Sequence, residues 1–147
     1  MLSNSMQRCC QLLAVAILAS GLYACGGSAG GGSASTASVK GDAVHGKELY
    51  ATCEGCHKLA ENSVGPMHCG LFGRPAGTVP GFEYSEAMKA SGIIWDAQKL
   101  DEFLVSPIAY VNGTKMGFAG FESATDRADV IAYLQHANKD PALCPAK

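Results

Sequence analysis

The sequence lacks several features that would point to whole classes of function. Its 11 Lys and Arg residues form no dense run in a chain of net charge −2, so nucleic-acid binding is unsupported. The same scarcity weakens the case for docking to a partner through a strongly basic face. No segment alternates apolar and polar residues over the length of a strand, and no internal repeat occurs. What remains suffices for one globular domain of ordinary size, because 48% of the 147 residues are hydrophobic.

The N-terminal segment has the layout of a bacterial secretory signal. Met1–Arg8 has one positive charge, and the apolar run in Gln11–Ser20 is too short for a comfortable transmembrane helix. Leu22-Tyr23-Ala24-Cys25 resembles the lipobox, the processing site of bacterial lipoproteins. The resemblance implies a signal peptide over 1–24 and a lipidated Cys25. A plain cleaved signal that leaves Cys25 as a free thiol is one alternative, and an uncleaved anchor is another.

A tether is expected to follow. Gly26–Ser38 consists almost wholly of Gly, Ser and Ala, so it has no large apolar side chains to bury. We therefore expect a flexible tether over 25–39, with a mean span on the order of 20 Å. The mature domain would occupy 40–147 and would swivel close to a membrane.

Cys53-Glu54-Gly55-Cys56-His57 has the Cys-x-x-Cys-His spacing of a c-type haem attachment site. Two thiols at this spacing can each bond to a vinyl group of one porphyrin, and the following histidine can ligate the iron. A zinc site would need two further ligands, and no second close Cys or His pair follows. A thioredoxin-like pair would need a preceding strand, whereas Gly46–Thr52 looks like the end of a helix. We therefore expect one covalently bound haem c.

Two cysteines of the mature domain have no role in this scheme. Cys9 and Cys10 leave with the signal peptide, and once Cys25, Cys53 and Cys56 are assigned, Cys69 and Cys144 remain. An oxidising compartment favours joining them. Such a bridge would tie the C-terminal tail to the loop after the haem motif. Two separate free thiols are the alternative.

Helix signals occur on both sides of a long loop. Asp42 can cap a helix through Tyr50, Ser85–Ala90 is a short helical candidate, and Asp96 can cap a helix that ends before Pro107. The last helix begins at Ser123 or Thr125, because apolar residues then recur at helical spacing.

The connections between these helices are expected to be irregular. Lys58–Gly81 is rich in Gly and Pro, and Val111–Phe121 has no helical pattern. A loop as long as Lys58–Gly81 is uncommon unless it has a function, and wrapping a large flat apolar cofactor is one such function. The predicted fold class is therefore all-α.

An electron-transfer haem needs a second axial ligand, usually Met or His. Met116 is favoured because its loop lies far along the chain from His57, and the loop's glycines permit close approach to a ring. Met67 and Met88 are expected to fill the core. The other histidines of the domain are assigned to surfaces, namely His45, His68 and His136.

The sequence contains seven motifs in one order: Gly46-Lys47, Val64-Gly65-Pro66, Gly70-Leu71-Phe72-Gly73-Arg74, Pro80-Gly81-Phe82-x-Tyr84, Gly92-Ile93-x-Trp95, Gly113-Thr114-Lys115-Met116-x-Phe118-Ala119-Gly120 and Arg127-x-Asp129-Val130-Ile131-Ala132-Tyr133-Leu134. Together they resemble class I cytochrome c, close to the branch of mitochondrial cytochrome c and bacterial cytochrome c2. The likeness covers roughly Asp42 to His136. It implies crossing N- and C-terminal helices, with long loops around one covalently bound haem.

The resemblance also implies roles for single residues. His57 and Met116 would be the axial ligands, and the Pro66 carbonyl would orient the imidazole. The haem propionates, which are costly to bury unpaired, would be held by Arg74, Tyr84 and Trp95. The remaining residues implied are Thr114, which would brace the methionine loop, Phe118 as a further haem contact, and Gly46, Val130 and Tyr133 at the helix crossing.

The sequence departs from the family at several of these positions. Phe103 stands where the family often has a Tyr hydrogen-bonded to the methionine sulfur, which should alter the redox potential. One residue is missing between Gly46 and Cys53. Either Leu49 or Tyr50 could therefore pack on the haem.

We therefore predict a single-haem electron carrier that is not an enzyme, tethered to a bacterial membrane and facing the periplasm. With both axial positions filled, it would bind no small-molecule substrate. Its partners, by resemblance, would be a cytochrome bc complex and a terminal oxidase or reaction centre. The basic residues expected near the exposed haem edge are Lys47, Lys58, Lys89 and Lys115.

Three other functions are open. The chain could be a dedicated haem subunit of a dehydrogenase, a haem peroxidase or a gas sensor. A peroxidase needs a distal acid or base, and Asn112–Gly120 has no His, Asp or Glu.

Overall fold

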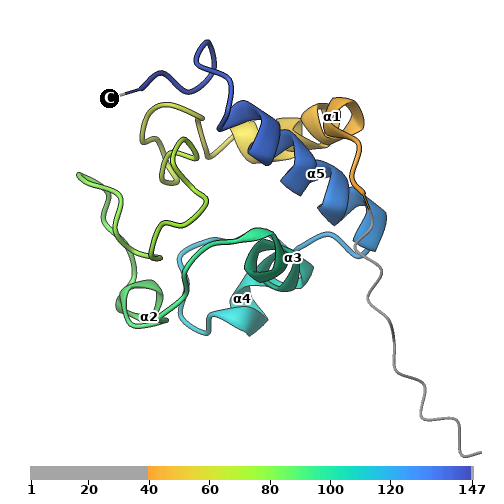
Figure 1. The fold of residues 1–147 in the computed structure, drawn as a ribbon. Helices are drawn as coiled ribbons and strands as arrows, with labels where there is room; N and C mark the ends of the chain where they lie inside the picture. Colours follow the sequence, from red (N-terminus) through yellow and green to blue (C-terminus); the bar gives the residue numbers. More distant parts are fainter. Residues whose placement is uncertain (1–39, 147) are drawn as a thin grey trace, which may run out of the picture. The chain divides into compact units, whose positions relative to one another are not determined.

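The computed structural model describes residues 40–146 of the chain (Figure 1). The expected signal peptide over 1–24, the lipidated Cys25 and the tether over 25–39 lie outside these residues. Within them, an isolated bridge between Pro75 and Ile94 is the only strand-like pairing. The helices are α1 (Ala43–Glu54), α2 (Glu86–Lys89), α3 (Ala97–Val105), α4 (Pro107–Tyr110) and α5 (Ala124–Ala137). The predicted all-α fold is confirmed. None of these described helices is both long and apolar enough to cross a membrane.

All the described helices except α4 begin at polar side chains that accept hydrogen bonds from free backbone N–H groups. Asp42 Oδ1 accepts from Val44 N at 2.8 Å at the start of α1. Asp96 Oδ1 accepts from Lys99 N at 2.7 Å before α3, as predicted. Ser123, one of the two predicted starts, caps α5.

Two helical features differ from the prediction. α1 continues past Tyr50 to Glu54, so it includes the first cysteine of the haem motif. Pro107 ends α3 as expected, but it also opens α4 as its first residue. Proline suits that position because its missing N–H would have no partner in the first turn.

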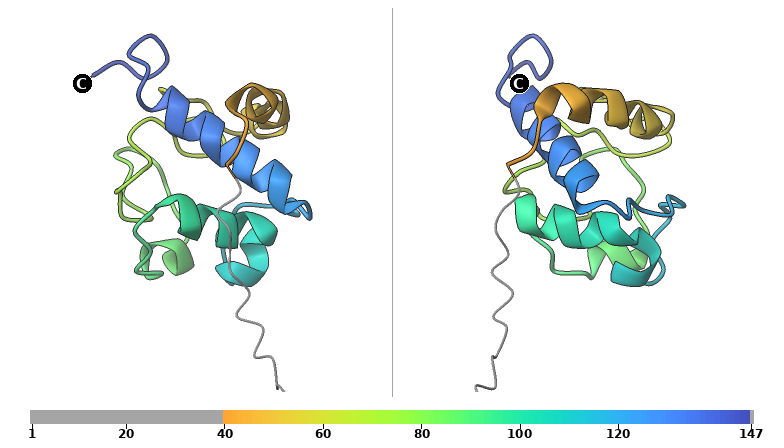
Figure 2. Two further views of the ribbon diagram at one scale, coloured as in Figure 1. Left: turned by 45° about the vertical axis from the view of Figure 1, so that its right-hand side comes forward. Right: turned by 90° about the vertical axis from the view of Figure 1, so that its right-hand side faces the viewer.

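The first and last helices cross at a glycine (Figure 2). A Cβ built at Gly46 of α1 would overlap the backbone carbonyl of Asp129 in α5. The close approach brings Tyr50 and Tyr133 together, with ring centroids 5.1 Å apart. Tyr50 and Val130 are each only 1% exposed. The residues that the family resemblance assigned to the crossing therefore lie at or beside it.

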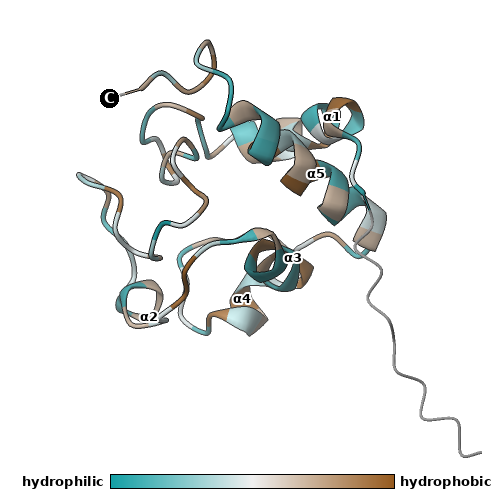
Figure 3. Cartoon of the chain, in the orientation of Figure 1, coloured by the Kyte–Doolittle hydropathy of each residue, from teal (hydrophilic) through white to brown (hydrophobic). Residues whose placement is uncertain are grey.

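The crossed pair α1 and α5 forms one side of the domain, and α2, α3 and α4 form the other (Figures 1 and 2). Apolar residues of α5 face towards α3 (Figure 3). Core side chains from the two helices include Leu100, Phe103 and Leu104 of α3 and Val130, Ile131 and Leu134 of α5. Long loops close the remaining side.

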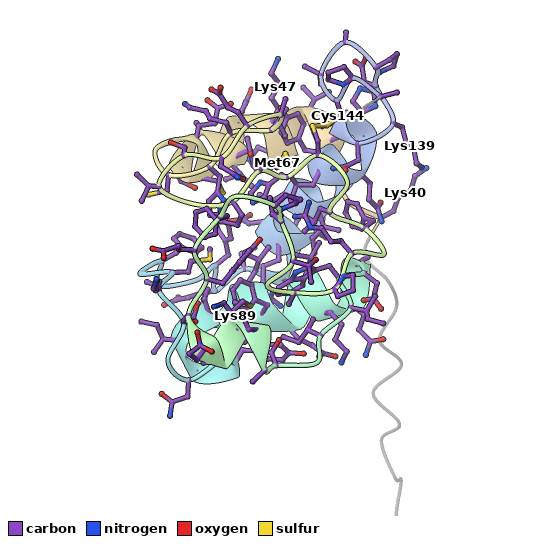
Figure 4. The ribbon with its side chains drawn as sticks, turned by 90° about the vertical axis from the view of Figure 1, so that its left-hand side faces the viewer. Lys40, Lys47, Met67, Lys89, Lys139 and Cys144 are labelled. Atoms are coloured by element: carbon purple, nitrogen blue, oxygen red, sulfur yellow. A yellow bond between two sulfur atoms is a disulfide. The ribbon has the colours of Figure 1, made fainter. Side chains whose placement is uncertain are left out.

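Two long-range ties hold the C-terminal tail against the loop that follows the haem motif. Asn138 Oδ1 accepts from the backbone N–H groups of Gly70 and Leu71, at 2.7 and 3.1 Å. A disulfide joins Cys69 to Cys144, whose Cα atoms are 5.3 Å apart. Figure 4 draws this disulfide in yellow beside the Cys144 label. The tail therefore fixes the loop from outside the helical core.

Candidate functional site

A cavity of about 480 Å³ lies between the two sides of the domain. All ten residues that the sequence assigned to haem binding line it: Cys53, Cys56, His57, Pro66, Arg74, Tyr84, Trp95, Thr114, Met116 and Phe118. Most of the remaining wall is apolar, with Leu71, Phe82, Met88, Leu100, Phe103, Leu104, Val130 and Leu134. Segments that are distant in sequence thus converge on one space suited to a large apolar group.

The Cys-x-x-Cys-His motif forms the end of α1 and the turn after it. The N–H groups of Cys56 and His57 both donate to the Cys53 carbonyl, at 3.1 and 2.8 Å. Both thiols are free in this structure, Cys53 half-buried and Cys56 exposed. Burial raises the pKa of Cys53, so its sulfur is a thiol at neutral pH. The turn presents two thiols and an imidazole to one cavity.

The His57 ring is buried and oriented by the loop beside it. Its Nδ1 lies 2.8 Å from the Pro66 carbonyl oxygen. A carbonyl can only accept, so Nδ1 holds the proton and Nε2 keeps its lone pair. Burial lowers the pKa of His57 below its ordinary value, which favours the neutral ring. A neutral imidazole with one fixed N–H is the form that ligates a metal.

Asn62, which sequence reasoning missed, braces the loop around Pro66. Its Oδ1 accepts from Met67 N at 3.1 Å, and its Nδ2 donates to the Pro80 carbonyl at 2.9 Å. Gly65 packs so closely on His57 that a Cβ there would overlap the ring. The position of the imidazole is therefore set by the path of the loop.

Arg74 is the cation that this loop brings to the cavity. Its Nη1 donates to the Cys69 carbonyl and its Nη2 to the Met67 carbonyl, each at 3.0 Å. Burial lowers the pKa of Arg74, but its ordinary value is so high that the guanidinium stays charged. Burial raises the pKa of Tyr84, and the nearby Arg74 acts against that rise. With Trp95, these residues form a polar corner suited to carboxylates.

The methionine loop supplies the thioether from the far part of the chain. Met116 N donates to Thr114 Oγ1 at 3.2 Å, and Thr114 N donates to the Val111 carbonyl at 3.0 Å. Gly113 has a φ of 92°, a left-handed conformation that favours glycine in this turn. Met116 is half-buried and lines the cavity. Thr114 thus braces the turn that presents the methionine.

Met67 and Met88 are both buried, as predicted for core residues. Met88 also lines the cavity, whereas Met67 does not appear in its wall. The sequence left open whether Leu49 or Tyr50 of α1 packs on the haem. Tyr50 lines the cavity, whereas Leu49 packs against the core and is not part of the cavity wall.

The placement of His68 on the surface is wrong. Its ring lines the cavity, stacked on His57 with centroids 4.3 Å apart. Tyr50 Oη lies 2.9 Å from His68 Nδ1. Burial lowers the pKa of His68 well below its ordinary value, so the ring is neutral. One signal in the sequence could have placed His68 at the site, namely its position two residues after Pro66. His45 and His136 are exposed, as expected.

The chemistry of this wall fits a covalently attached haem. Two free thiols, an imidazole with an available Nε2, a thioether and a half-buried arginine line a mainly apolar space. Between Lys40 and Ala146, no three His, Cys, Asp or Glu residues gather closely enough to hold a metal ion directly. The thiols therefore lack the companions of a zinc site.

Comparisons with known proteins agree with this fit. The family model described as cytochrome c matches residues 43–138. The chain is similar to cytochrome c of Euglena viridis, with 47% identity over 98 residues that cover 65% of this chain and 96% of that protein. It is also similar to cytochrome c2 of Rhodomicrobium vannielii, with 47% identity over 97 residues, 64% of this chain and 78% of that protein.

A solved structure shows the same fold. Cytochrome cH from Methylobacterium extorquens superposes with a TM-score of 0.64 at 40% identity, covering 65% of this chain and 99% of that one. The match of fold, family model and sequence agrees with the resemblance to the mitochondrial and bacterial branch. The chain therefore belongs to the cytochrome c family, of class I, and is a haem electron carrier with one covalently attached haem c.

Proposed function

We propose that this chain is a membrane-tethered electron carrier of the bacterial periplasm, with haem c bonded to Cys53 and Cys56 and ligated by His57 and Met116. The main support is the convergence of all ten assigned residues on one cavity. When bound, the haem supplies an iron that exchanges one electron between Fe(II) and Fe(III).

The surrounding residues would orient the ligands and exclude water. The hydrogen bond from His57 to the Pro66 carbonyl fixes which nitrogen faces the cavity. Arg74 would neutralise carboxylates that are costly to bury alone, and Tyr84 and Trp95 would complete that corner. Leucine and phenylalanine side chains on the wall keep water from the interior.

The wall around Met116 favours a carrier over a peroxidase. No Asp or Glu lines the cavity, and Thr114–Phe118 contains no His, Asp or Glu that could serve as a distal acid or base. The imidazole of His68 stacks on His57. It therefore lies on the side of the cavity that holds the histidine ligand and not on the side of Met116. A filled position at Met116 would also exclude small ligands, which disfavours a gas sensor.

The cavity reaches the surface at a mouth where a redox partner could approach. Val64, Lys115 and Gly117 line the cavity and are exposed, Val64 to 75%. The mouth is thus mostly uncharged. We propose that a cytochrome bc complex and a terminal oxidase or reaction centre exchange electrons there.

The ligand assignment is tested by the full chain with Met116→Ala beside Met67→Leu as a control. Wild type and Met67→Leu should give a six-coordinate low-spin spectrum with a methionine-to-iron charge-transfer band. Met116→Ala should lose that band and bind carbon monoxide rapidly in its ferrous form. A wild-type protein that binds carbon monoxide rapidly, or a Met116→Ala variant with an unchanged spectrum, contradicts the proposal.

The tether is tested by intact-mass measurement and cell fractionation. The mature protein should begin at Cys25 and have the added mass of one haem and a lipid. Replacing Cys25 with Ala should move the haem protein from the membrane fraction to the soluble periplasmic fraction. Wild-type haem protein found only in the soluble fraction would contradict the lipid anchor and leave the haem assignment untouched.

A further inference from the structure

A second imidazole stands beside the axial histidine in this chain. The rings of His57 and His68 have centroids 4.3 Å apart and planes 21° apart, which is a stacked arrangement. Stacked aromatic pairs contribute attraction beyond the area they bury. One face of the His57 ring is therefore packed by a polar ring.

The His68 ring is itself fixed by α1. Its Nδ1 lies 2.9 Å from the hydroxyl oxygen of Tyr50, and the two ring centroids are 5.7 Å apart. Tyr50 is 1% exposed and packs on Tyr133 of α5. A side chain held so tightly cannot turn away to release its hydrogen-bond partner.

The backbone of His68 is equally constrained. Its N–H donates to the carbonyls of Lys58 and Leu59, at 3.1 and 3.0 Å. The next residue, Cys69, donates to the Leu59 carbonyl at 2.7 Å and is bonded to Cys144. His68 is thus held from the helix side by Tyr50 and from the tail side by the disulfide.

We propose that Tyr50 and His68 form a hydrogen-bonded pair that positions the axial histidine and tunes the redox potential through it. This inference rests on the proposed ligation of iron by His57. The hydrogen bond to Pro66 holds one edge of the His57 ring, and His68 restrains the ring's tilt by packing on its face. His68 is a positioning residue and touches no reacting atom.

The pair also has a defined electrostatic effect. A neutral hydrogen-bonded imidazole is more polar than an aliphatic side chain, and polar surroundings favour the more highly charged ferric state. Replacing His68 with an aliphatic residue should therefore favour the ferrous state. The two contributions, ring orientation and polarity, can be separated by different substitutions.

The experiment compares His68→Leu, His68→Phe and Tyr50→Phe with wild type in the full haem-loaded chain. His68→Leu removes both stacking and polarity, whereas His68→Phe keeps a ring against His57 and removes only the polarity. Tyr50→Phe removes one hydroxyl. The control is His136→Leu, because His136 is an exposed histidine of α5.

Two measurements report on the proposed role. The first is the ferrous-to-ferric ratio at a fixed applied potential. It should rise about twofold to tenfold in His68→Leu and His68→Phe, the effect of one hydrogen-bonded group. A tenfold change corresponds to 59 mV for one electron. The second is the pattern of haem-methyl shifts in the ferric proton NMR spectrum, which reports the orientation of the axial ligand plane. It should change in His68→Leu and stay close to wild type in His68→Phe.

Tyr50→Phe should shift the ratio in the same direction, and in combination with His68→Leu it should add little, because the two residues act as one unit. Wild-type ratio and methyl shifts in His68→Leu would overturn the inference, as would full additivity in the double variant. Should His68→Leu fail to fold, His68→Phe and Tyr50→Phe decide the question by the ratio. A methionine-to-iron band retained in every variant keeps the proposed function standing in either outcome.

Discussion

The polar side chains of the cavity wall are held mainly by backbone carbonyls. His57 donates to Pro66, and Arg74 donates to Cys69 and Met67. All of these carbonyls belong to the loop that follows the haem motif. The orientation of a ligand and of a cation therefore follows from the path of one loop, and side-chain rotamers have little freedom to change it.

Phe103 gives a prediction for a single side chain. It is buried on the cavity wall, at the position where the family often has a tyrosine that is hydrogen-bonded to the methionine sulfur. Phe103→Tyr should raise the midpoint potential, because a hydroxyl that donates to the sulfur withdraws electron density and favours ferrous iron. A hydrogen bond of roughly 0.5–1.5 kcal/mol corresponds to about 20–60 mV for one electron. Spectroelectrochemical titration measures the shift, with Phe72→Tyr outside the cavity wall as a control, and an unchanged or lower potential contradicts the prediction.

The contact between His45 and Asp129 gives a pH-dependent prediction. His45 Nδ1 lies 2.8 Å from Asp129 Oδ2. The hydrogen bond with Asp129 raises the pKa of His45, while that bond and the Asp42 N–H lower the pKa of Asp129. The stabilisation from His45 is fully present below the unfolded pKa of about 6.5 and is lost as the pH rises through the higher folded value. That from Asp129 is lost only as the pH falls through a folded value below 3.8.

The stabilisation by this pair should therefore be larger at pH 5 than at pH 8. The test compares the free energy of unfolding of wild type and His45→Gln at both pH values. His45 is exposed, so the pairing is partly screened and the difference should shrink in high salt. If wild type and His45→Gln differ in free energy of unfolding by the same amount at pH 5 and at pH 8, the pair does not contribute to the pH dependence of stability.

Among the helices, sequence predicted the starts better than the ends. The caps at Asp42 and Asp96 appear where expected, because a capping side chain acts on N–H groups within three residues. The end of α1 was missed, although Gly55 directly follows Glu54 and glycine is common just after a helix. Proline at 107 was seen only as a stop, although the same residue suits the first turn of α4.

The close helix crossing predicts that even a methyl side chain at position 46 lowers the folding stability. Gly46→Ala places a methyl group against the Asp129 carbonyl, and overpacking of this kind costs about 1–3 kcal/mol. Better helix propensity returns only about 1 kcal/mol. The net loss is measured by guanidinium unfolding of the ferric protein. Gly55→Ala is the matched control, since a Cβ there meets nothing within 4 Å and φ is −59°. Equal stability of the two variants would show that the crossing can relax.

Over the whole molecule, positive charge is dispersed and partly paired. In Figure 4, Lys47 lies near the top of the domain and Lys89 in its lower part. Lys89 pairs with Glu86 at 2.9 Å, and Lys115 donates to the Glu83 carbonyl at 3.3 Å. Of the four lysines expected near the haem edge, Lys47 and Lys89 therefore lie apart, and Lys89 is paired with an acidic residue.

Electron exchange with a partner should accordingly depend only weakly on salt. Rates steered by a strong charged face fall by about 10- to 1,000-fold when steering is removed. Here the bimolecular rate should change by less than about tenfold between low and physiological ionic strength. Stopped-flow reduction of the haem-loaded chain by a purified bc complex measures this rate. A steep fall with salt would indicate a charged docking face that the lysine positions do not suggest.

Sequence motifs identified the cavity residues, but they did not identify the contacts that hold the loops in place. Asn62, His68 and Asn138 each act between segments distant in sequence. A loop without periodicity has no pattern from which its path can be read, so partners across it stay hidden. The pair Cys69 and Cys144 could be foreseen because cysteines can be counted, whereas the asparagine that acts beside them could not.

The disulfide gives the last prediction, because it closes the largest loop of the domain. Cys69 and Cys144 are 75 residues apart, and closing a loop of that size restricts the unfolded chain by about 4.5 kcal/mol. Residual structure in the unfolded chain reduces this effect, so we expect a smaller loss, about 2–3 kcal/mol, in Cys69→Ala/Cys144→Ala. Because a reductant would also reduce the iron, the double variant and wild type are compared by guanidinium unfolding with both proteins ferric. Asn138→Ala, which removes the neighbouring tie and keeps the disulfide, is the matched comparison and should cost about 1–3 kcal/mol. A double variant within about 0.5 kcal/mol of wild type would mean that the disulfide adds little to the other contacts that hold this loop.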